Sequence, residues 1–164
     1  MNEYLESVKK RDPAAKSILS IILTYPGVKA VFMHKISNFF HIAGFHLIAR
    51  IISQATRFFT GIEIHPGAKI GKNLFIDHGM GVVIGETSKI DENVSIYQGV
   101  TLGGKGFEIG DRHPKIKSGV SIFASSTVLG NITIGKNAKV AAGSLVLKDV
   151  EAETTVAGIP AKKL

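Results

Sequence analysis

The 164-residue chain contains no cysteine. Without a thiol it can form no disulfide framework, no thiolate zinc site and no cysteine nucleophile. It also lacks a signal peptide, because the polar stretch 1–11 has no hydrophobic core. The longest apolar stretch, 36–49, is bounded by Lys35 and Arg50 and is too short to span a bilayer. These absences predict a soluble, cytoplasmic protein with no membrane partner.

Runs of basic residues are also missing, although the formal net charge is +7. Nucleic-acid-binding chains cluster their basic residues and interleave them with aromatic ones, and this chain does neither. We therefore expect no nucleic-acid partner. An excess of scattered lysines suits an anionic small molecule, such as a phosphate-bearing cofactor.

The sequence does contain a six-residue repeat between Ile64 and Val150. Its thirteen aliphatic anchors fall in three phased blocks: Ile64, Ile70 and Ile76; Ile84, Ile90, Ile96 and Leu102; Ile116, Ile122, Val128, Ile134, Val140 and Val146. Four positions after each anchor the residue is usually small or aliphatic. Such a fixed short period is typical of a parallel β-helix, in which three hexads make one triangular coil and stacking buries the anchors. A set of unrelated short strands would not keep this phase.

The first 62 residues have a helical pattern instead. Asp12-Pro13 predicts a helix start, with Asp12 as N-cap and Pro13 at the first helical position, and that helix is expected to run to Thr24. Two further helices are expected over 26–43 and 45–59. The predicted domains are a helical segment over 1–62, the β-helix over 63–154, and a C-terminal cap over 155–164 that leaves the β-helix and covers its last coil.

Two irregularities interrupt the repeat, and function is expected where regular structure is broken. The first is a widened corner over 77–83. The second is the stretch 103–115, which is too polar and too rich in glycine to continue the core, and is predicted to project as a loop.

His78 is the candidate general base. It lies two residues after its anchor, and the equivalent positions in later coils are Gln98, Ala124 and Ala142. If the loop keeps the phase, these four residues stack along one edge at roughly 4.8 Å per coil. A groove floored by small residues suits a thin chain such as a pantetheine arm, with the histidine at its reactive end. The alternative is an exposed corner residue without a role.

Charged residues near both irregularities can complete such a site. A general-base histidine needs an acceptor on its other ring nitrogen, and Glu63 and Asp77 both lie near this corner. The alternative for Glu63 is a solvated carboxylate. In the loop, Arg112 offers a planar fork for a carboxylate, beside His113 and the stiffening Pro114.

Several short motifs then occur in order. They are Arg11-Asp12-Pro13-Ala14, Ile64-His65-Pro66-Gly67-Ala68, Asp77-His78, Val83-Ile84-Gly85-Glu86-Thr87, Val100-Thr101-Leu102-Gly103-Gly104, Gly110-Asp111-Arg112-His113-Pro114-Lys115 and Ala157-Gly158-Ile159-Pro160-Ala161. From about Arg11 to its end, the chain resembles the serine O-acetyltransferase family of hexapeptide-repeat acyltransferases. The resemblance implies a left-handed parallel β-helix. It also implies transfer of acetyl from acetyl-CoA to the hydroxyl of L-serine, the step that feeds cysteine biosynthesis, with no metal.

The resemblance also implies a role for individual residues. His78 is the general base, and Glu63 stands where the family usually has the aspartate that orients it. The substrate-binding residues are Asp12 and Asp77 at the serine ammonium, Arg112 at its carboxylate, and His113 in the same pocket. Acetyl-CoA is held at Gly104, Ala124, Lys139 and Ala142. The family reacts through a ternary complex without an acyl-enzyme.

The chain departs from the family pattern in three places. Glu63 is one methylene longer than the usual aspartate. The long N-terminal extension that joins two trimers is mostly missing, and so is the C-terminal tail that docks into O-acetylserine sulfhydrylase. We therefore expect a homotrimer with sites between neighbouring β-helices, and no sulfhydrylase complex.

Two other functions fit the same repeat. An acetyltransferase for another hydroxyl acceptor, such as homoserine or a sugar, would keep His78 but would not need Asp12, Asp77 and Arg112 together. A zinc carbonic anhydrase on a β-helix would need three converging histidines, for which His65, His78 and His113 are the candidates. A non-enzymatic scaffold would not need the Arg112-His113 loop.

Overall fold

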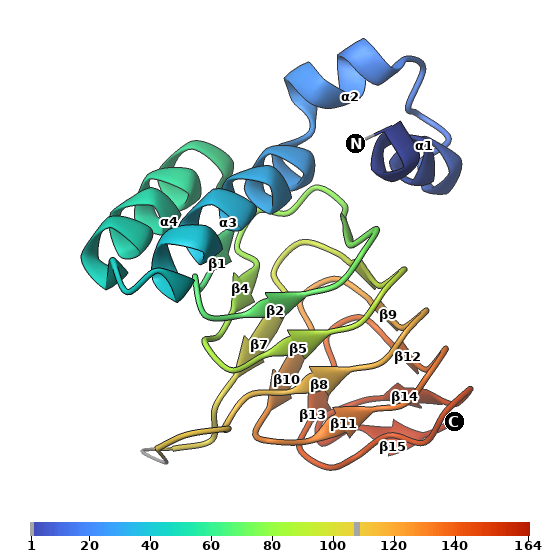
Figure 1. The fold of residues 1–164 in the computed structure, drawn as a ribbon. Helices are drawn as coiled ribbons and strands as arrows, with labels where there is room; N and C mark the ends of the chain where they lie inside the picture. The colour runs from blue at the N-terminus through green and yellow to red at the C-terminus, as the bar shows by residue number, and fades with distance from the viewer. Residues whose placement is uncertain (1, 107–108) are drawn as a thin grey trace.

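The computed structural model describes residues 2–106 and 109–164, which form a helical segment set on one end of a triangular β-helix (Figure 1). The helices are α1 (Asn2–Arg11), α2 (Ile18–Thr24), α3 (Pro26–Ile42) and α4 (His46–Thr60). α3 and α4 pack side by side across the first coils, and α1 and α2 lie beyond the start of α3 (Figure 1). Among the described residues, no helix is both long enough and apolar enough to cross a membrane.

The predicted helix start at Asp12 is wrong. The Asp12 carboxylate accepts a hydrogen bond from the Ala14 N–H at 2.7 Å, which closes a tight turn after α1. α2 begins only at Ile18, where the Ser17 hydroxyl accepts from the Ser20 N–H at 3.1 Å as N-cap. An aspartate before a proline satisfies a turn as well as a helix, because its side chain bonds to the backbone two residues on in either case.

The β-helix is built from strands of two or three residues, one on each face of each coil. They are β1 (Glu63–Ile64), β2 (Lys69–Ile70), β3 (Phe75–Ile76), β4 (Val83–Ile84), β5 (Lys89–Ile90), β6 (Ser95–Ile96), β7 (Thr101–Gly103), β8 (Lys115–Ile116), β9 (Ser121–Ile122), β10 (Thr127–Leu129), β11 (Thr133–Ile134), β12 (Lys139–Val140), β13 (Leu145–Val146), β14 (Thr155–Ala157) and β15 (Lys162–Lys163).

Strands one coil apart pair in parallel and give three sheets. The first face is β1-β4-β7-β10-β13, the second is β2-β5-β8-β11, and the third is β3-β6-β9-β12-β14 with β15. Two edges of the triangle matter below. The His78 edge joins the third face to the first and holds the turns 77–82, 97–100, 123–126 and 141–144. The loop edge joins the first face to the second and holds the turns 65–68, 85–88, 104–114 and 130–132.

The repeat anchors form the core, as predicted. Twelve of the thirteen are at most 4% exposed, and Ile70 is partly buried. Two of the buried serines between them have local hydrogen-bond partners. The hydroxyls of Ser126 and Ser144 both donate to the carbonyl oxygen of Ala141, at 2.8 and 2.6 Å. Apolar burial and stacked backbone hydrogen bonds therefore act on the same hexads.

The C-terminal cap begins later than predicted. β14 continues the third face, because Val156 pairs in parallel with Val140 and is 7% exposed. Only after Gly158 does the chain reverse, and β15 then pairs antiparallel with β14. Val156 keeps the anchor pattern for one further rung, so the hydrophobic register extends the β-helix past residue 154.

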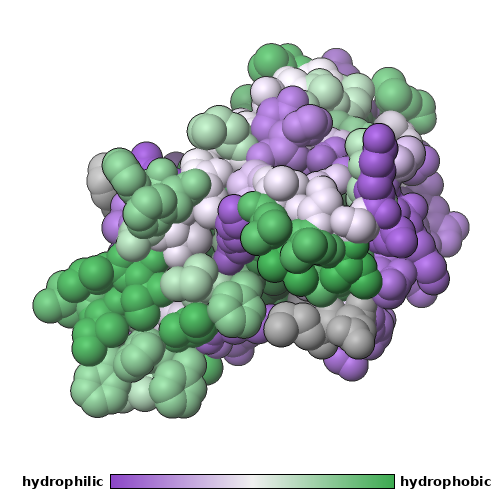
Figure 2. Space-filling model, turned by 90° about the horizontal axis from the view of Figure 1, so that it is seen from above, coloured by the Kyte–Doolittle hydropathy of each residue, from purple (hydrophilic) through white to green (hydrophobic). Residues whose placement is uncertain are grey.

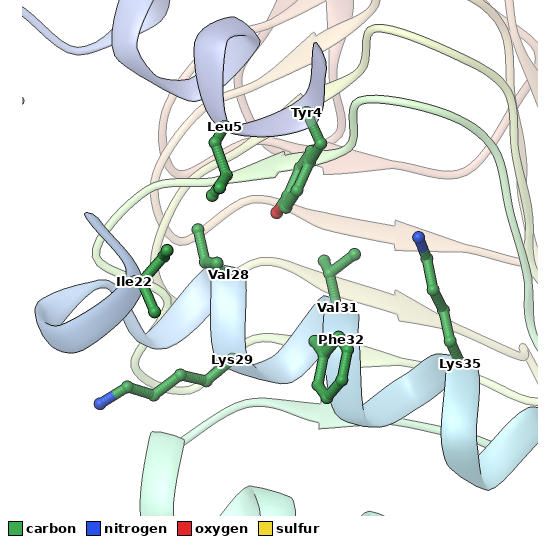
Figure 3. A pocket seen from close by; sticks show the side chains of 8 residues that line it. All are labelled: Tyr4, Leu5, Ile22, Val28, Lys29, Val31, Phe32 and Lys35. Carbon is green, nitrogen blue, oxygen red and sulfur yellow. The ribbon is translucent and has the colours of Figure 1, made fainter. Parts of the chain in front are cut away.

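The helical segment leaves many large apolar side chains in the open. Phe39, Ile42, Phe58 and Phe59 are 66%, 78%, 81% and 83% exposed. Seen from above the helical end, apolar side chains gather in patches over this part of the molecule (Figure 2). A cavity of about 350 Å³ also lies beside α1 and α3 (Figure 3), lined by Tyr4, Leu5, Ile22, Val28, Lys29, Val31, Phe32 and Lys35.

Candidate active site

The widened corner lies at the top of the His78 edge. Its turn holds six residues, 77–82, whereas the turn below it holds four, 97–100. His78 takes a left-handed conformation with φ +57°, which few residues other than glycine adopt. Gly79 lies against Ile62, where any side chain would overlap, and the Gly81 N–H donates to the Gly61 carbonyl at 2.8 Å. The contacts with Gly61 and Ile62 thus hold the backbone of the turn in place, while the His78 side chain is exposed to solvent.

The predicted column along this edge forms, except at its top. The strand register aligns Gln98, Ala124 and Ala142, since Ile96, Ile122 and Val140 are paired. Backbone hydrogen bonds continue through the turns, from Ser125 N–H to Gln98 at 2.8 Å and from Gly143 N–H to Ala124 at 2.9 Å.

At the top of the column, the Gly99 N–H donates to Met80 at 2.9 Å. The two extra residues therefore put Met80 above Gln98 and displace His78 from the column. The predicted direct stacking of His78 is wrong for this reason, although His78 still lies on the same edge.

Two carboxylates reach this edge from different parts of the chain. Asp77 directly precedes His78, and Asp12 follows α1. Arg11 ties the end of α1 to the β-helix: its guanidinium donates to the carbonyl oxygens of Asn73 at 2.6 Å and Val94 at 3.1 Å, and lies 5.0 Å above the Phe75 ring. A planar guanidinium with five donors suits this combination of carbonyl contacts and stacking. The predicted substrate residues Asp12 and Asp77 are thus both fixed near β3.

Glu63 has different partners from those predicted. Its carboxylate oxygens lie 3.0 Å from Arg57 Nη1 and 3.7 Å from Arg50 Nη2, and Gln54 Nε2 donates to it at 3.4 Å. These three residues share one side of α4, which packs along β1. Among the described residues, no hydrogen bond joins Glu63 to His78, so its role in orienting the histidine stays a prediction.

The loop predicted over 103–115 follows β7 and precedes β8; residues 104–106 and 109–114 lie on the loop edge, and residues 107–108 are outside the described part of the chain. Thr87 holds its end. The Thr87 hydroxyl oxygen accepts from the N–H groups of Arg112 at 3.0 Å and His113 at 3.1 Å, and it lies 2.8 Å from His113 Nδ1. The Thr87 N–H also donates to that Nδ1 at 3.2 Å. Since Nδ1 accepts, the proton of the neutral imidazole sits on Nε2.

The buried His113 ring packs against Gly85, where any side chain would overlap it. Burial, and then the positive charge of Arg112, lower the pKa of His113, so the ring stays neutral at physiological pH. Arg112 Nη2 lies 3.7 Å from Glu86 Oε2, and its side chain is 36% exposed. The guanidinium is therefore available to a ligand.

The predicted cofactor residues do not gather at one place in the chain. Ala124 and Ala142 lie on the His78 edge, and Lys139 is exposed on β12 of the third face. Gly104 opens the loop, where an added methyl group would come 3.5 Å from Arg112 Cδ. A ligand that touches all four would have to contact the His78 edge, the third face and the loop.

The three histidines proposed for a zinc site do not converge. His65 and His113 lie on the loop edge, and His78 lies on the His78 edge. The His65 Nδ1 accepts from the Gly67 N–H at 3.0 Å. Across residues 2–106 and 109–164, no three histidine, aspartate or glutamate side chains are grouped so that they could hold a metal ion.

Sequence reasoning missed two residues of this region. Thr87 belongs to a quoted motif, but its isolated hydroxyl carries no signal that it would bind a loop 25 residues later. Tyr25 stands between two helices, and its hydroxyl donates to Asp12 Oδ2. Nothing in the spacing of Tyr25 and Asp12 indicates this contact, because the turn after α1 creates it.

Known proteins match both the repeat and the whole chain. Residues 113–148 match the bacterial transferase hexapeptide (six repeats) family. Serine acetyltransferase from Bacillus pumilus is 53% identical over 162 residues, which are 99% of this chain and 75% of that protein. Serine acetyltransferase from Staphylococcus xylosus is 58% identical over 160 residues, 98% of this chain and 74% of that protein.

Solved structures of serine acetyltransferases also superpose on nearly the whole chain. Serine acetyltransferase from Brucella abortus strain S19, in complex with coenzyme A, superposes with a TM-score of 0.97 at 41% identity, over 99% of this chain and 65% of that one. Soybean serine acetyltransferase complexed with serine gives 0.95 at 44% identity, over 98% and 66%. The chain spans just under two thirds of the length of these two structures. The predicted left-handed parallel β-helix is confirmed, and the chain belongs to the serine acetyltransferase family.

Proposed function

We propose that this protein transfers the acetyl group of acetyl-CoA to the hydroxyl of L-serine and releases O-acetyl-L-serine. The proposal rests on the groups found at two edges of the β-helix. One presents an exposed histidine beside two carboxylates, and the other presents a neutral histidine beside an arginine. These groups match the hydroxyl, ammonium and carboxylate of serine. Relatives at 53–58% identity that are named serine acetyltransferases, and related structures with coenzyme A or serine bound, support the proposal.

The reaction needs one base and no acyl-enzyme intermediate. His78 takes the proton of the serine hydroxyl while the oxygen attacks the thioester carbonyl carbon. The tetrahedral intermediate collapses, the C–S bond breaks, and the coenzyme A sulfur receives the proton from His78. A carboxylate stabilises the imidazolium between these steps, and Glu63 and Asp77 are the candidates.

The acceptor is held by its two charged groups. Arg112 grips the carboxylate through two parallel hydrogen bonds, which fix its direction as well as its position. His113 offers its Nε2–H to the same group, because Thr87 occupies Nδ1. Asp12 and Asp77 take the ammonium. Acetyl-CoA runs along the His78 edge over Ala124 and Ala142, with Gly104 and Lys139 contacting its length.

We infer a homotrimer from the same geometry. The His78 edge and the loop edge are different corners of one triangle, separated by roughly 20 Å if a face of about six residues rises 3.3 Å per residue. One serine cannot reach both in a single chain, so the site is complete only where the His78 edge of one β-helix meets the loop edge of a neighbour. Its substrate acetyl-CoA is made inside cells, and we place the protein in the cytoplasm.

An acceptor panel tests the proposal. Thiol release from acetyl-CoA is measured with L-serine, L-homoserine and a hexose, each at equal concentration. We expect release with serine to be at least about tenfold faster than with either alternative. An acceptor that leaves a charged group of the site unpaired loses at least the free energy that corresponds to this factor. Equal rates, or a preference for the hexose, would assign the chain to another acceptor.

A further inference from the structure

Tyr25 lies near the two carboxylates of the His78 edge and contacts one of them, Asp12. It follows α2 and precedes α3, and its hydroxyl donates a hydrogen bond to Asp12 Oδ2. That bond, burial, and the negative charges of Asp12 and Asp77 raise the pKa of Tyr25 to about 12. The phenol therefore keeps its proton at every pH at which an acetyltransferase works, and it is a permanent donor.

The backbone around Tyr25 fixes this position. Gly27 packs on the end of β3, where any side chain would overlap the Ile76 carbonyl oxygen. Ile76 directly precedes Asp77, so the missing side chain at Gly27 lets Tyr25 approach Asp77. On the other side, Arg11 ties the residue before Asp12 to the carbonyls of Asn73 and Val94. Asp12 and Asp77 are thus both placed beside β3, and the Tyr25 hydroxyl holds the Asp12 carboxylate there.

Two carboxylates close together repel each other, and a free aspartate side chain relieves that repulsion by rotating away. Asp12 is restrained at both oxygens, by the Ala14 N–H at Oδ1 and by the Tyr25 hydroxyl at Oδ2. Each carboxylate oxygen accepts about two hydrogen bonds, so one position stays open on each. The restrained carboxylate can still accept a cation with several N–H donors.

We propose that Tyr25 is a positioning residue for the acceptor's ammonium group, holding Asp12 beside Asp77 so that both carboxylates face one cation. The inference rests on the proposed function and adds the element that selects an amino acid over a simple hydroxy acid. Tyr25 itself touches Asp12 and acts through it. Its ring packs against the small apolar cluster of α1 and α2, so removing only the hydroxyl leaves that packing in place.

The experiment compares two acceptors on Tyr25→Phe and the wild type. L-Serine has the ammonium, and 3-hydroxypropionate keeps the hydroxyl and carboxylate without it. We expect Tyr25→Phe to lower kcat/KM for serine about tenfold, the scale of one hydrogen bond to a charged group. The change should fall on KM, with kcat within about twofold, because the ammonium is bound equally before and during reaction. For 3-hydroxypropionate the change should stay below about twofold on the same argument.

Tyr4→Phe is the matched control. The Tyr4 hydroxyl is buried without a hydrogen-bond partner among the described residues, and it lines the cavity of Figure 3. Its loss should leave the preference for serine unchanged. In an Asp12→Asn background, Tyr25→Phe should also have no further effect on that preference, because the group it positions is gone.

The outcomes separate the two proposals. Equal losses on both acceptors, or a full effect of Tyr25→Phe in the Asp12→Asn background, would make Tyr25 a merely structural residue and overturn the inference. No loss at all would overturn it too. A wild-type protein that releases no thiol with serine would instead refute the proposed function, and the inference with it. Thermal unfolding of each variant establishes that its losses come from a folded enzyme.

Discussion

The β-helix and the helical segment bury their apolar residues in opposite ways. In the β-helix, the anchors of successive coils stack on one another, and side chains such as Ile122 and Ile134 are fully buried. In the helical segment, residues of similar size such as Phe58 and Leu47 are 81% and 75% exposed. The β-helix closes its core within one chain. The helical segment packs one side on the first coils and leaves large apolar side chains on its other side exposed.

The proposed chemistry lies where these two regions meet. The β-helix supplies Asp77 and His78 in a corner distorted by two extra residues, and the helical segment supplies Asp12 and Tyr25. A regular solenoid repeats the same backbone positions from coil to coil. The helices, in contrast, place individual side chains beside the distorted corner. The regular coils therefore give the site a rigid support, and the distorted corner and the helices supply its reactive and binding side chains.

Removing one anchor tests the comparison most strongly. Ile122→Ala should lower the free energy of unfolding by about 2–5 kcal/mol, the range for truncating a fully buried aliphatic side chain. Phe58→Ala removes more atoms, yet in a dilute, dissociated chain it should change that free energy by no more than about 0.5 kcal/mol. Urea denaturation at low protein concentration measures both. Similar losses for the two variants would mean that the helical segment has a closed core of its own.

Acid should weaken the helical segment's hold on the β-helix. Burial lowers the pKa of His34 to about 4, against the opposing effect of a backbone hydrogen bond to Ala68. His34 therefore stays neutral in the folded state at pH values at which it is already protonated in the unfolded chain, that is, below about pH 6.5. Stability is fully present above that pH and declines as the pH falls towards 4, by on the order of 3 kcal/mol. Denaturation of wild type and His34→Gln across this range should show a flatter curve for the variant; parallel curves would exclude His34 as the source.

The distorted corner should matter for turnover and not for folding. His78→Ala should lower kcat by about a hundredfold or more, the usual scale for loss of a general base, with the melting temperature unchanged. His46→Ala, an exposed histidine of the helical segment, is the matched control and should keep full activity. Near-normal turnover of a folded His78→Ala enzyme would remove this residue from the mechanism.

The loop edge should decide the choice of acceptor. Arg112→Lys should lower kcat/KM for L-serine, with a loss of transition-state stabilisation of about 2–3 kcal/mol, because lysine cannot form two parallel hydrogen bonds to a carboxylate. Serinamide and ethanolamine, which lack that carboxylate, should be poor acceptors for the wild type and should lose less in the variant. If the variant kept its full preference for serine, the loop would need another role.

Thr87 should have the smallest effect of these residues. Thr87→Val keeps the shape but removes the acceptor of two backbone N–H groups and the hydroxyl beside His113 Nδ1. We expect kcat/KM for serine to fall about tenfold, in line with one to two lost hydrogen bonds, and Thr87→Ser to restore it. ¹⁵N shifts of His113 should show a single tautomer in both proteins, because the backbone N–H at position 87 still donates to Nδ1. Thr154→Val is the control, because among the described residues the Thr154 hydroxyl bonds only to the Glu151 carbonyl oxygen.

The sequence by itself determined the β-helix, its buried anchors and the two interruptions. A six-residue period has one way to bury its aliphatic positions, so each hexad is decided locally and the stack follows. The motifs around Asp12, His78 and Arg112 were likewise sufficient to predict the family. The end of the repeat at Val156 was missed because a single valine after a break is a weak signal.

Only the tertiary structure decided how those residues meet. The turn at Asp12, the displacement of His78 by two extra residues, the arginines around Glu63, and the contacts of Thr87 and Tyr25 all depend on packing between segments far apart in the chain. A hydrogen bond between distant residues leaves no period in a sequence, because only one residue of each partner takes part. The placement of the His78 edge and the loop edge at different corners is a property of the closed triangle, which exists only once the coils have formed.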